Sequence, residues 1–330
     1  MRILVVGAIQ GGTIPICRSI HHAFMDIGQQ VDLLDFSEFQ NEFFETRNHM
    51  NLSYQFYLKI KIILLEKVVG FQPDVIFGIA QSPLQDIDML AEFKKAGIAL
   101  CFWFMEDYRI FGYWKNIAPY FDHFFTIQKD PFWKELKDAG CRNYHYLPMA
   151  FDSYADVHEM NGEKAIPVSF VGAPYPNRVH FFSQFLDDGF QIFGEDWNRH
   201  KNPRVVTGDR RITENEAYHI YRRSFVNINL HSSPFPGEFG GGDFVNPRTF
   251  ELAGLGAFQL TDMRKLLTLH FDPAEEVIAL TSWADMKWAV KYFLQHDEER
   301  KAFAEKARAR VLKEHTYRRR AEEIIEILGK

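Results

Sequence analysis

The sequence is poor in cysteine. It contains only three, Cys17, Cys101 and Cys141, which are widely spaced and include no C-x-x-C pair. A disulfide framework or a structural zinc site needs more cysteines at closer spacing, so neither is expected. This usage fits a reducing compartment, and we expect a cytoplasmic protein.

Long hydrophobic runs are also missing. No apolar stretch approaches the roughly 18 residues that mark a membrane-spanning helix, so stable membrane insertion is not expected. The first residues, MRILVVGA, contain one basic residue and a short apolar run that ends at glycine. This pattern predicts a first β-strand and not a signal peptide.

The chain has no excess of positive charge. Its 38 lysines and arginines stand against 44 acidic residues, for a net charge of −6. This balance gives no general reason to bind nucleic acid or an anionic membrane, so any phosphate site must be local. The charged tail after Trp283 carries both signs, which favours a solvated outer layer over a nucleic-acid arm.

What is present is a regular alternation of apolar runs and amphipathic segments. The first half predicts strands at 2–8, 30–36, 74–80, 98–105, 123–128 and 143–148, with helices from about Pro15, across 55–69 and near 84–96. Such alternation is typical of an α/β fold with a parallel sheet covered on both faces. Residues 1–155 are therefore expected to form an N-terminal Rossmann-like domain.

A polar segment, 152–166, is the expected linker, and a second alternation follows it. Strands are predicted at 168–173, 190–194, 225–231, 258–262 and 277–282, with helices from Asn177, over 214–222, from Pro247 and through the tail after Trp283. Residues 165–315 are expected to form a second Rossmann-like domain. The terminal helix, 316–330, is expected to rejoin the first domain.

A glycine-rich turn after the first strand contains Gly11, Gly12 and Thr13 and opens a helix. Glycines there let backbone N–H groups approach a phosphate or an acceptor substrate. A tight turn that simply needs small residues explains the pattern equally well. Asp35 at the end of the second strand keeps an NAD-binding interpretation open, although the turn is not G-x-G-x-x-G.

Glu106 and Asp107 follow the apolar strand at 98–105. Ligands of open α/β sheets gather at the carboxyl ends of strands, so these acids are candidates for a general base or for binding an acceptor hydroxyl. The alternative is structural: Asp107 would cap a helix and pair with Arg109.

The second domain has a similar turn, in which Gly172 ends a strand and Arg178 lies in the first turn of the next helix. An arginine at this position is suited to pair with a diphosphate. The alternative is an ordinary surface arginine.

The segment 225–262 carries the strongest signal. His231 and Ser232 end a strand, and a loop rich in glycine and proline follows, which we expect to close over a ligand as a lid. His231 is a candidate for catalysis or donor binding, although a lone histidine at a strand end is as often a core residue. No second His or Cys stands at ligand spacing, so no metal is expected.

The helix after this loop has Asn246 as its expected cap and Pro247 in its first turn. Arg248, Thr249 and the first backbone amides would offer donors to phosphate, and Glu251 would accept hydrogen bonds from ribose hydroxyls. We expect a nucleoside diphosphate here, with a capped surface helix as the alternative.

Several motifs together resemble the CgeB-type spore-maturation glycosyltransferases and, more distantly, the large GT-B families. They are NPRTFELAGLG at 246–256, LTD at 260–262, VSFVGAPYPNR at 168–178, FMEDYR at 104–109, LLTLHFDPAEEVIAL at 266–280 and EHTYRRRAEEII at 314–325. The resemblance implies two Rossmann-like domains facing a central cleft, with the C-terminal helices packing across. It also implies a nucleotide-diphosphate sugar as donor substrate and no metal or other cofactor.

Two positions depart from the pattern of related enzymes. Related enzymes usually have a glutamate eight residues before the residue that corresponds to Glu251, and this chain has Asp243 there. They often have proline at the position of Phe258. By resemblance Glu251 would hold the donor ribose.

The reaction implied is transfer of a hexosyl group to the hydroxyl of a glycan, an envelope polysaccharide or a protein. Arg178, Arg248 and helix amides would stabilise the departing diphosphate, and Glu106 or Asp107 would act as base if the reaction inverts configuration. Inversion and retention both stay open, as do the nucleotide, the sugar and the oligomeric state. The alternatives are a nucleotide-sugar epimerase of the same fold, an inactive glycosyltransferase-like binding protein and, least favoured, an NAD-dependent oxidoreductase.

Overall fold

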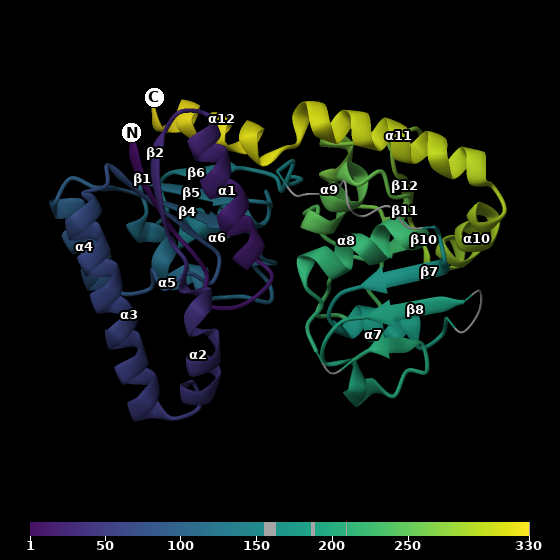
Figure 1. The fold of residues 1–330 in the computed structure, drawn as a ribbon, viewed down its shortest axis with the longest axis horizontal. Helices are drawn as coiled ribbons and strands as arrows, with labels where there is room; N and C mark the ends of the chain where they lie inside the picture. The colour runs from purple at the N-terminus through teal and green to yellow at the C-terminus, as the bar shows by residue number, and fades with distance from the viewer. Residues whose placement is uncertain (155–162, 186–188, 209, 330) are drawn as a thin grey trace. The chain divides into compact units, whose positions relative to one another are not determined.

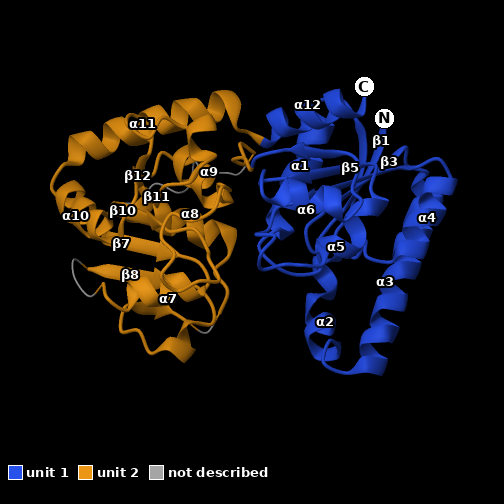
Figure 2. Ribbon diagram, turned by 180° about the vertical axis from the view of Figure 1, so that it is seen from behind, with its two compact units in different colours: residues 1–148, 317–330 blue, residues 149–316 orange. Residues whose placement is uncertain are grey.

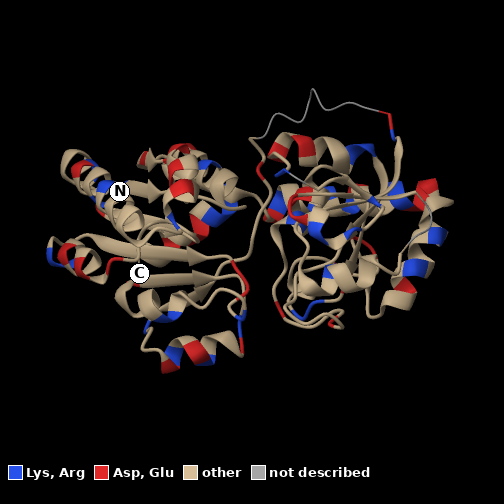
Figure 3. Ribbon diagram, turned by 90° about the horizontal axis from the view of Figure 1, so that it is seen from below, with Lys and Arg blue, Asp and Glu red and all other residues tan. Residues whose placement is uncertain are grey.

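A computed structural model describes residues 1–154, 163–185, 189–208 and 210–329 (Figure 1). The chain divides into two compact units (Figure 2). Unit 1 comprises residues 1–148 and 317–330, and unit 2 comprises residues 149–316. Lysine and arginine are intermixed with aspartate and glutamate over both units, as Figure 3 shows. Among the described residues, none of the helices combines the length and the hydrophobicity of a membrane-spanning segment.

Unit 1 is built on a six-stranded sheet in the order β2-β1-β3-β4-β5-β6, in which every neighbouring pair is parallel. The strands are β1 (Arg2–Val6), β2 (Gln30–Leu34), β3 (Val75–Ile79), β4 (Ala99–Phe104), β5 (His123–Thr126) and β6 (Tyr144–Tyr146). The central strands β3 and β4 are almost entirely buried, as parallel strands covered on both faces must be.

Helices surround this sheet. They are α1 (Ile14–Asp26), α2 (Gln40–Thr46), α3 (Met50–Phe71), α4 (Ile87–Lys95), α5 (Trp114–Ile117), α6 (Phe132–Asp138) and α12 (Tyr317–Leu328). The last of these packs against α1, so the C-terminal segment completes unit 1. The core is dense in aromatic rings, among them Phe102, Phe104, Phe124 and Phe132.

Unit 2 repeats the plan with a second parallel sheet in the order β12-β11-β10-β7-β8-β9. Its strands are β7 (Ile166–Val171), β8 (Phe190–Phe193), β9 (Val205–Thr207), β10 (Ser224–Asn229), β11 (Gln259–Asp262) and β12 (Ile278–Leu280). Its helices are α7 (Pro176–Phe182), α8 (Glu214–Arg223), α9 (Pro247–Gly254), α10 (Trp283–Leu294) and α11 (Asp297–Glu314).

The two segments by which the chain enters and leaves unit 2 lie side by side. The backbone N–H of Phe151 donates to the carbonyl of His315 at 2.8 Å, and Phe151 forms a parallel bridge with Thr316. The Phe151 ring lies against Gly254, where an added Cβ would come within 2.2 Å of it. Glycine at this position lets the entry segment pack closely on α9.

The two parallel α/β sheets confirm the predicted fold class. The helix predicted at 55–69 is longer than expected, beginning at Met50 and ending at Phe71. Most of the expected linker, residues 155–162, lies outside the described residues, and its last residue, Ile166, already belongs to β7. The elements α2, α5, α6 and β9 were not predicted.

Candidate functional site

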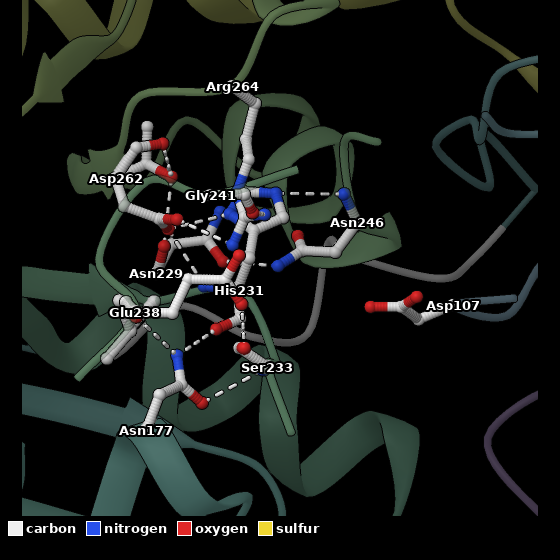
Figure 4. Close-up of polar contacts among 12 residues, drawn as sticks. Asp107, Asn177, Asn229, His231, Ser233, Glu238, Gly241, Asn246, Asp262 and Arg264 are labelled. Carbon is white, nitrogen blue, oxygen red and sulfur yellow. Dashed lines mark hydrogen bonds and ion pairs between the residues drawn. The ribbon is translucent and has the colours of Figure 1, made fainter. Parts of the chain in front are cut away.

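Polar residues meet at the carboxyl edge of the unit 2 sheet, where the neighbouring parallel strands β10 and β11 end. His231 follows β10 and Asp262 ends β11. The His231 Nδ1 lies 2.7 Å from the Asp262 Oδ1, and the His231 backbone N–H donates to the same oxygen at 2.8 Å (Figure 4). The strand order thus creates a pair that lies 31 residues apart in sequence.

The second ring nitrogen of His231 is also occupied. Its Nε2 accepts the backbone N–H of Asn246 at 3.0 Å, and the side chain is fully buried. Burial lowers the pKa of His231 to about 4, against the opposing effect of Asp262, so the ring is neutral at pH 7. A neutral ring that donates from Nδ1 and accepts at Nε2 fits both contacts. His231 therefore positions the start of α9, and direct ligand contact would require one of these bonds to break.

Asp262 is held as a carboxylate. Although burial alone would raise its pKa, the Arg264 guanidinium and His231 keep that pKa well below its usual range. The Arg264 Nη2 lies 2.7 Å from the Asp262 Oδ2, and Arg264 also donates to the carbonyl of Gly241 in the glycine-rich loop. Asp262 was not singled out among the candidates, although it ends a predicted strand.

The N-terminus of α9 is capped as predicted. The Asn246 Oδ1 accepts from the backbone N–H and the hydroxyl of Thr249, both at 3.0 Å. Asn229 closes the network, since its Nδ2 donates to the Thr249 hydroxyl at 2.8 Å and its Oδ1 accepts from the Asn246 Nδ2 at 2.9 Å. The side chains of Asn246 and Thr249 thus hold the helix start in place.

The loop between His231 and Asn246 is fastened to its surroundings. The Asn177 amide donates to the His231 carbonyl at 2.8 Å and accepts the Ser233 backbone N–H at 2.9 Å, while Ser233 also bonds the Glu238 carboxylate (Figure 4). The buried Asp243 accepts the Leu266 backbone N–H through its own carbonyl. Closure of this loop as a lid stays a prediction, and it would have to proceed from this anchored state.

Two arginines form the most distinctive feature of unit 2. The guanidinium groups of Arg178 and Arg248 each lie 5.0 Å from the centre of the Phe170 ring. Arg178 is only 5% exposed, so the surface-arginine alternative is wrong. Burial and then the neighbouring Arg248 lower the pKa of Arg178 to about 9. The two positive charges therefore repel each other.

Neither arginine has a carboxylate partner within ion-pair distance among the described residues. Arg178 donates to the carbonyls of Leu230 and Ala173 at 3.0 and 3.1 Å. Arg248 makes two long bonds of 3.3 Å, to the Tyr221 hydroxyl and the Asn229 Oδ1. Buried positive charges normally have an anionic partner. Arg178 is buried and Arg248 half-buried, so the pair is suited to binding an external anion.

Gly172 brings the backbone up to this pair. It follows β7 with a φ of +153°, and an added Cβ would lie 2.6 Å from the Arg248 Nη2 and 3.0 Å from the Phe170 ring. Only glycine fits without strain. The half-buried Ser232 follows His231 at the neighbouring strand end.

Glu251 lies one turn into α9, three residues after Arg248. Burial raises the pKa of Glu251 to about 7, an effect that Arg248 opposes and Glu214 reinforces. Its carboxylate has no hydrogen-bond or ion-pair partner in the described part of the chain, although the residue is half-buried. An unpartnered carboxylate beside an unpaired arginine can accept hydrogen bonds from ligand hydroxyls.

Unit 1 has its own polar cluster, at the carboxyl edge of its sheet, where the chain leaves the neighbouring strands β1 and β3 toward opposite sides, to β2 and to β4. Glu106 follows β4 and is 8% exposed. Its carboxylate accepts from the Tyr113 hydroxyl at 2.7 Å and from the Gln81 side-chain amide. Burial raises the pKa of Glu106, and the two hydrogen bonds lower it by less. The group has the environment of a general base with a raised pKa.

Gln81, which the sequence analysis did not select, organises this cluster. It follows β3 with a φ of +67°, a conformation that is strained for a residue with a side chain. Its Oε1 is buried without a hydrogen-bond donor among the described residues. A Cβ on Gly11 would lie 2.2 Å from that oxygen, which explains the glycine. The turn at Gly11 is thus tight, and it lies against the Gln81 Oε1, an acceptor without a donor among the described residues.

The remaining candidates of unit 1 are engaged within it. Asp107 accepts the Arg109 backbone N–H and pairs with its guanidinium at 2.8 Å. The pairing of the structural alternative is thus confirmed, but the helix cap is not, because the next helix, α5, begins only at Trp114. The Thr13 hydroxyl donates to the Ala80 carbonyl at 3.0 Å, and Gly12 is exposed. Asp35 pairs with Arg18 at 2.9 Å, so the carboxylate that an NAD ribose would need is occupied.

Comparison with known proteins agrees with this architecture. Residues 178–326 match the glycosyl transferase-like family. The spore protein CgeB of Bacillus subtilis (strain 168) is 26% identical over 261 residues, which cover 73% of this chain and 78% of CgeB. The Anabaena HepE protein in complex with UDP-glucose superimposes with a TM-score of 0.62 and 11% identity over 99% of both chains. A sucrose-phosphate synthase from Thermosynechococcus elongatus superimposes with a TM-score of 0.62 and 11% identity, over 99% of this chain and 98% of the synthase chain.

The family match covers Arg178, Arg248 and Glu251, and the solved structures share the fold at low identity. The chain therefore resembles CgeB along most of its length, its second half matches the glycosyl transferase-like family, and it shares the fold of these two solved structures.

Proposed function

We propose that the chain transfers a hexosyl group from a nucleoside diphosphate sugar bound by unit 2 to the hydroxyl of an acceptor bound by unit 1. The observation that carries the proposal is the pair of guanidinium groups, Arg178 and Arg248, over the Phe170 ring without a carboxylate partner. A diphosphate supplies the missing negative charge, and its oxygens match the donor geometry of arginine.

The donor would be oriented by α9. The diphosphate lies against Arg248 and the positive end of the helix, and Glu251 accepts the ribose hydroxyls. As the bond from the anomeric carbon to the phosphate oxygen breaks, negative charge grows on the diphosphate. Arg178 and Arg248 are fixed before the reaction, so they stabilise that charge without reorganisation.

The acceptor would bind at the unit 1 cluster. Its hydroxyl donates to Glu106, which takes the proton as the oxygen attacks the anomeric carbon in an inverting reaction. Gln81 and Tyr113 fix the carboxylate, and burial holds the pKa of Glu106 above that of an ordinary glutamate. Asp107 is the weaker candidate for the base, because Arg109 already pairs with it.

The reaction is proposed to need no metal. Among the described residues, no group of three or more His, Cys, Asp or Glu side chains is arranged to hold an ion. The two arginines would supply the charge that a divalent cation supplies elsewhere. Turnover that survives EDTA supports this, and turnover restored only by added Mg²⁺ or Mn²⁺ contradicts it.

Titration calorimetry with UDP, GDP and dTDP tests the donor site. One nucleotide should bind selectively, and Arg248→Ala should raise its Kd by about 10- to 100-fold, the usual effect of losing a charge-assisted contact. Arg199→Ala is the matched control, because Arg199 belongs to the same unit and its side chain is 81% exposed. Equal affinity in wild type and Arg248→Ala would refute the assignment.

The acceptor step needs a separate readout. With the nucleotide sugar identified, a glycosylated acceptor should form only when acceptor is present, and Glu106→Gln should abolish it without changing the nucleotide Kd. Conversion of the nucleotide sugar to its epimer without an acceptor would instead favour the epimerase. Tight binding with no product of either kind would favour an inactive binding protein.

A further inference from the structure

The long helix α3 of unit 1 has an inner apolar face. Phe56, Ile60, Leu64 and Val68 follow one another at intervals of four residues and are at most 8% exposed. They pack into the aromatic core of the unit. This face alone accounts for how α3 attaches to the sheet.

A second apolar face lies on the other side of α3. It is formed by Tyr54, Leu58, Ile62, Leu65 and Val69, at intervals of four, four, three and four residues, and their exposed fractions run from 37% to 74%. We call these five residues the outer stripe. Side chains three and four residues apart lie on one helix face, so the stripe is continuous over about 22 Å.

The concentration of exposed hydrophobic side chains here is unusual for the molecule. Among the described residues, eight of the large hydrophobic side chains that are exposed belong to α3. Those elsewhere are scattered, as is normal for a folded surface. A continuous apolar face on a helix marks a surface that another element covers.

The charges around α3 argue against a membrane as the covering surface. Its three lysines are all neutralised by acids of unit 1. The pairs are Lys59 with Glu42, Lys61 with Asp86 and Lys67 with Asp32. Helices that lie on anionic membranes instead carry free lysines and arginines on their polar face. A protein surface is therefore the better fit.

The outer stripe is complementary to itself. In an antiparallel pair of α3 helices with a two-fold axis near Ile62, Tyr54 of one copy faces Val69 of the other, and Leu58 faces Leu65. Intervals of three and four residues are those that interdigitate in paired helices. Two-fold pairing buries each stripe against the other and leaves neither stripe exposed.

The charged residues beside the stripe follow the same symmetry. Lys59 and Glu66 each directly follow a stripe residue and are seven residues apart, so they lie on one flank. In a two-fold antiparallel pair this flank meets its own counterpart, which brings Lys59 of one copy near Glu66 of the second. Glu66 is exposed and has no ion-pair partner among the described residues. We propose that the outer stripe of α3 binds a second copy of this chain.

Sedimentation velocity and light scattering of the full chain test the proposal, over about 1 to 100 μM. The wild type should be a dimer, and Ile62→Asp should be a monomer that still unfolds in a cooperative thermal transition, at a somewhat lower temperature because the dimer no longer stabilises the folded state. Val206→Asp is the matched control: Val206 is 55% exposed on the other unit, and the variant should stay dimeric. A wild type that is monomeric throughout, or an Ile62→Asp variant that still dimerises, would overturn the proposal.

A charge exchange tests the orientation. Glu66→Lys should raise the dimer Kd at least about tenfold, because Lys59 then faces a lysine, and Lys59→Glu should act in the same direction. The double variant should return to within about threefold of wild type, while a parallel or unrelated contact predicts additive losses. Binding of a monomeric wild type to vesicles of phosphatidylcholine and phosphatidylglycerol, lost in Ile62→Asp, would assign the stripe to a membrane instead.

Discussion

Some buried or half-buried charged residues of unit 2 have a partner of opposite charge, and others do not. Arg264 has Asp262 as its partner at 2.7 Å, whereas Arg178 and Arg248 have only neutral oxygens. Glu251 is a carboxylate without a donor in the described residues, and burial raises its pKa to about 7. The two arginines without a carboxylate partner and the carboxylate without a donor are the reason for proposing an anionic, hydroxyl-bearing ligand at the start of α9.

Glu251 should make stability depend on pH in a defined direction. Its pKa rises from 4.5 in the unfolded chain to about 7 in the folded protein. The folded state therefore favours the protonated form, and this stabilisation is complete below pH 4.5 and lost as the pH rises through 7. Glu251→Gln, which mimics that form, should match wild type near pH 4 and exceed it near pH 8 by on the order of 1–3 kcal/mol.

Chemical denaturation of ligand-free protein at both pH values measures this difference. Glu195→Gln is the control, because Glu195 belongs to the same unit and its side chain is 44% exposed. A Glu251→Gln variant with the same pH dependence as wild type would show that this carboxyl has an ordinary pKa.

Gln81 should tune the base in the acceptor cluster. Its amide donates to Glu106 and lowers the pKa of that carboxyl, so Gln81→Leu should raise the pKa further. We expect the acidic limb of the kcat/KM profile to move to higher pH and the rate at pH 7 to fall about tenfold. The nucleotide Kd should not change. A uniform loss of activity at every pH would indicate a merely structural role.

At the scale of helices and strands, α9 matters most for the donor site. Its first turn is fixed by Asn246, and Asn246 is fixed in turn by His231, which Asp262 orients. This chain of bonds connects the ends of β10 and β11 to the helix that carries Arg248 and Glu251. The proposed ligand groups are thus placed by buried elements and not by a flexible loop.

Loss of the α9 cap should therefore affect both stability and binding. Asn246→Ala should destabilise the protein by about 1–2 kcal/mol, because a cap is lost and buried partners are left unsatisfied. Thr213→Ala removes the exposed cap of α8 in the same unit and is the control. Thermal unfolding should show a loss in both variants, whereas calorimetry should show weaker nucleotide binding only for Asn246→Ala. If Asn246→Ala bound the nucleotide as tightly as wild type, the cap would not be needed for the donor site.

The sequence was sufficient to predict elements whose apolar pattern is long or fully buried. The strands of the unit 1 sheet, those of the unit 2 sheet except β9, and the long helices could be predicted for this reason. Helix α2 was missed because it has no buried residue, and α5, with four residues, is too short to show a period. Glu106 could be selected because it closely follows a strand, and Arg178 and Arg248 because each lies in the first turn of a helix.

Contacts that depend on strand order could not be predicted. His231 and Asp262 meet only because β11 lies beside β10, and Gln81 meets Gly11 only because β3 lies beside β1. Propensity and spacing do not determine which parallel strands become neighbours. The partners of the candidate residues could therefore not be predicted, although the sequence pattern was enough to select the candidates, whose roles stay predictions.

At the scale of the whole molecule, unit 1 is assembled from both ends of the chain. The terminal helix α12 buries Tyr317, Ala321 and Ile324. It packs on α1, and Arg320 donates to the Pro148 carbonyl at 2.8 Å. Unit 2 is a single continuous segment.

Removal of residues 317–330 should therefore destabilise the two units unequally. Loss of the buried α12 side chains should weaken unit 1 by several kcal/mol, since each large apolar side chain contributes roughly 1.5–3 kcal/mol. Unit 2 should keep its own transition in differential scanning calorimetry and still bind nucleoside diphosphate. A single transition shifted as a whole would show that the units unfold together.

The late position of α12 in the sequence also sets an order of events during synthesis. Every residue of unit 2 leaves the ribosome before α12 does. Unit 2 can therefore complete its sheet while unit 1 still lacks the helix that packs on α1. The exposed surface of α1 is then a target for chaperones until the last helix arrives. For this chain, the domain that is translated first is the one that finishes folding last.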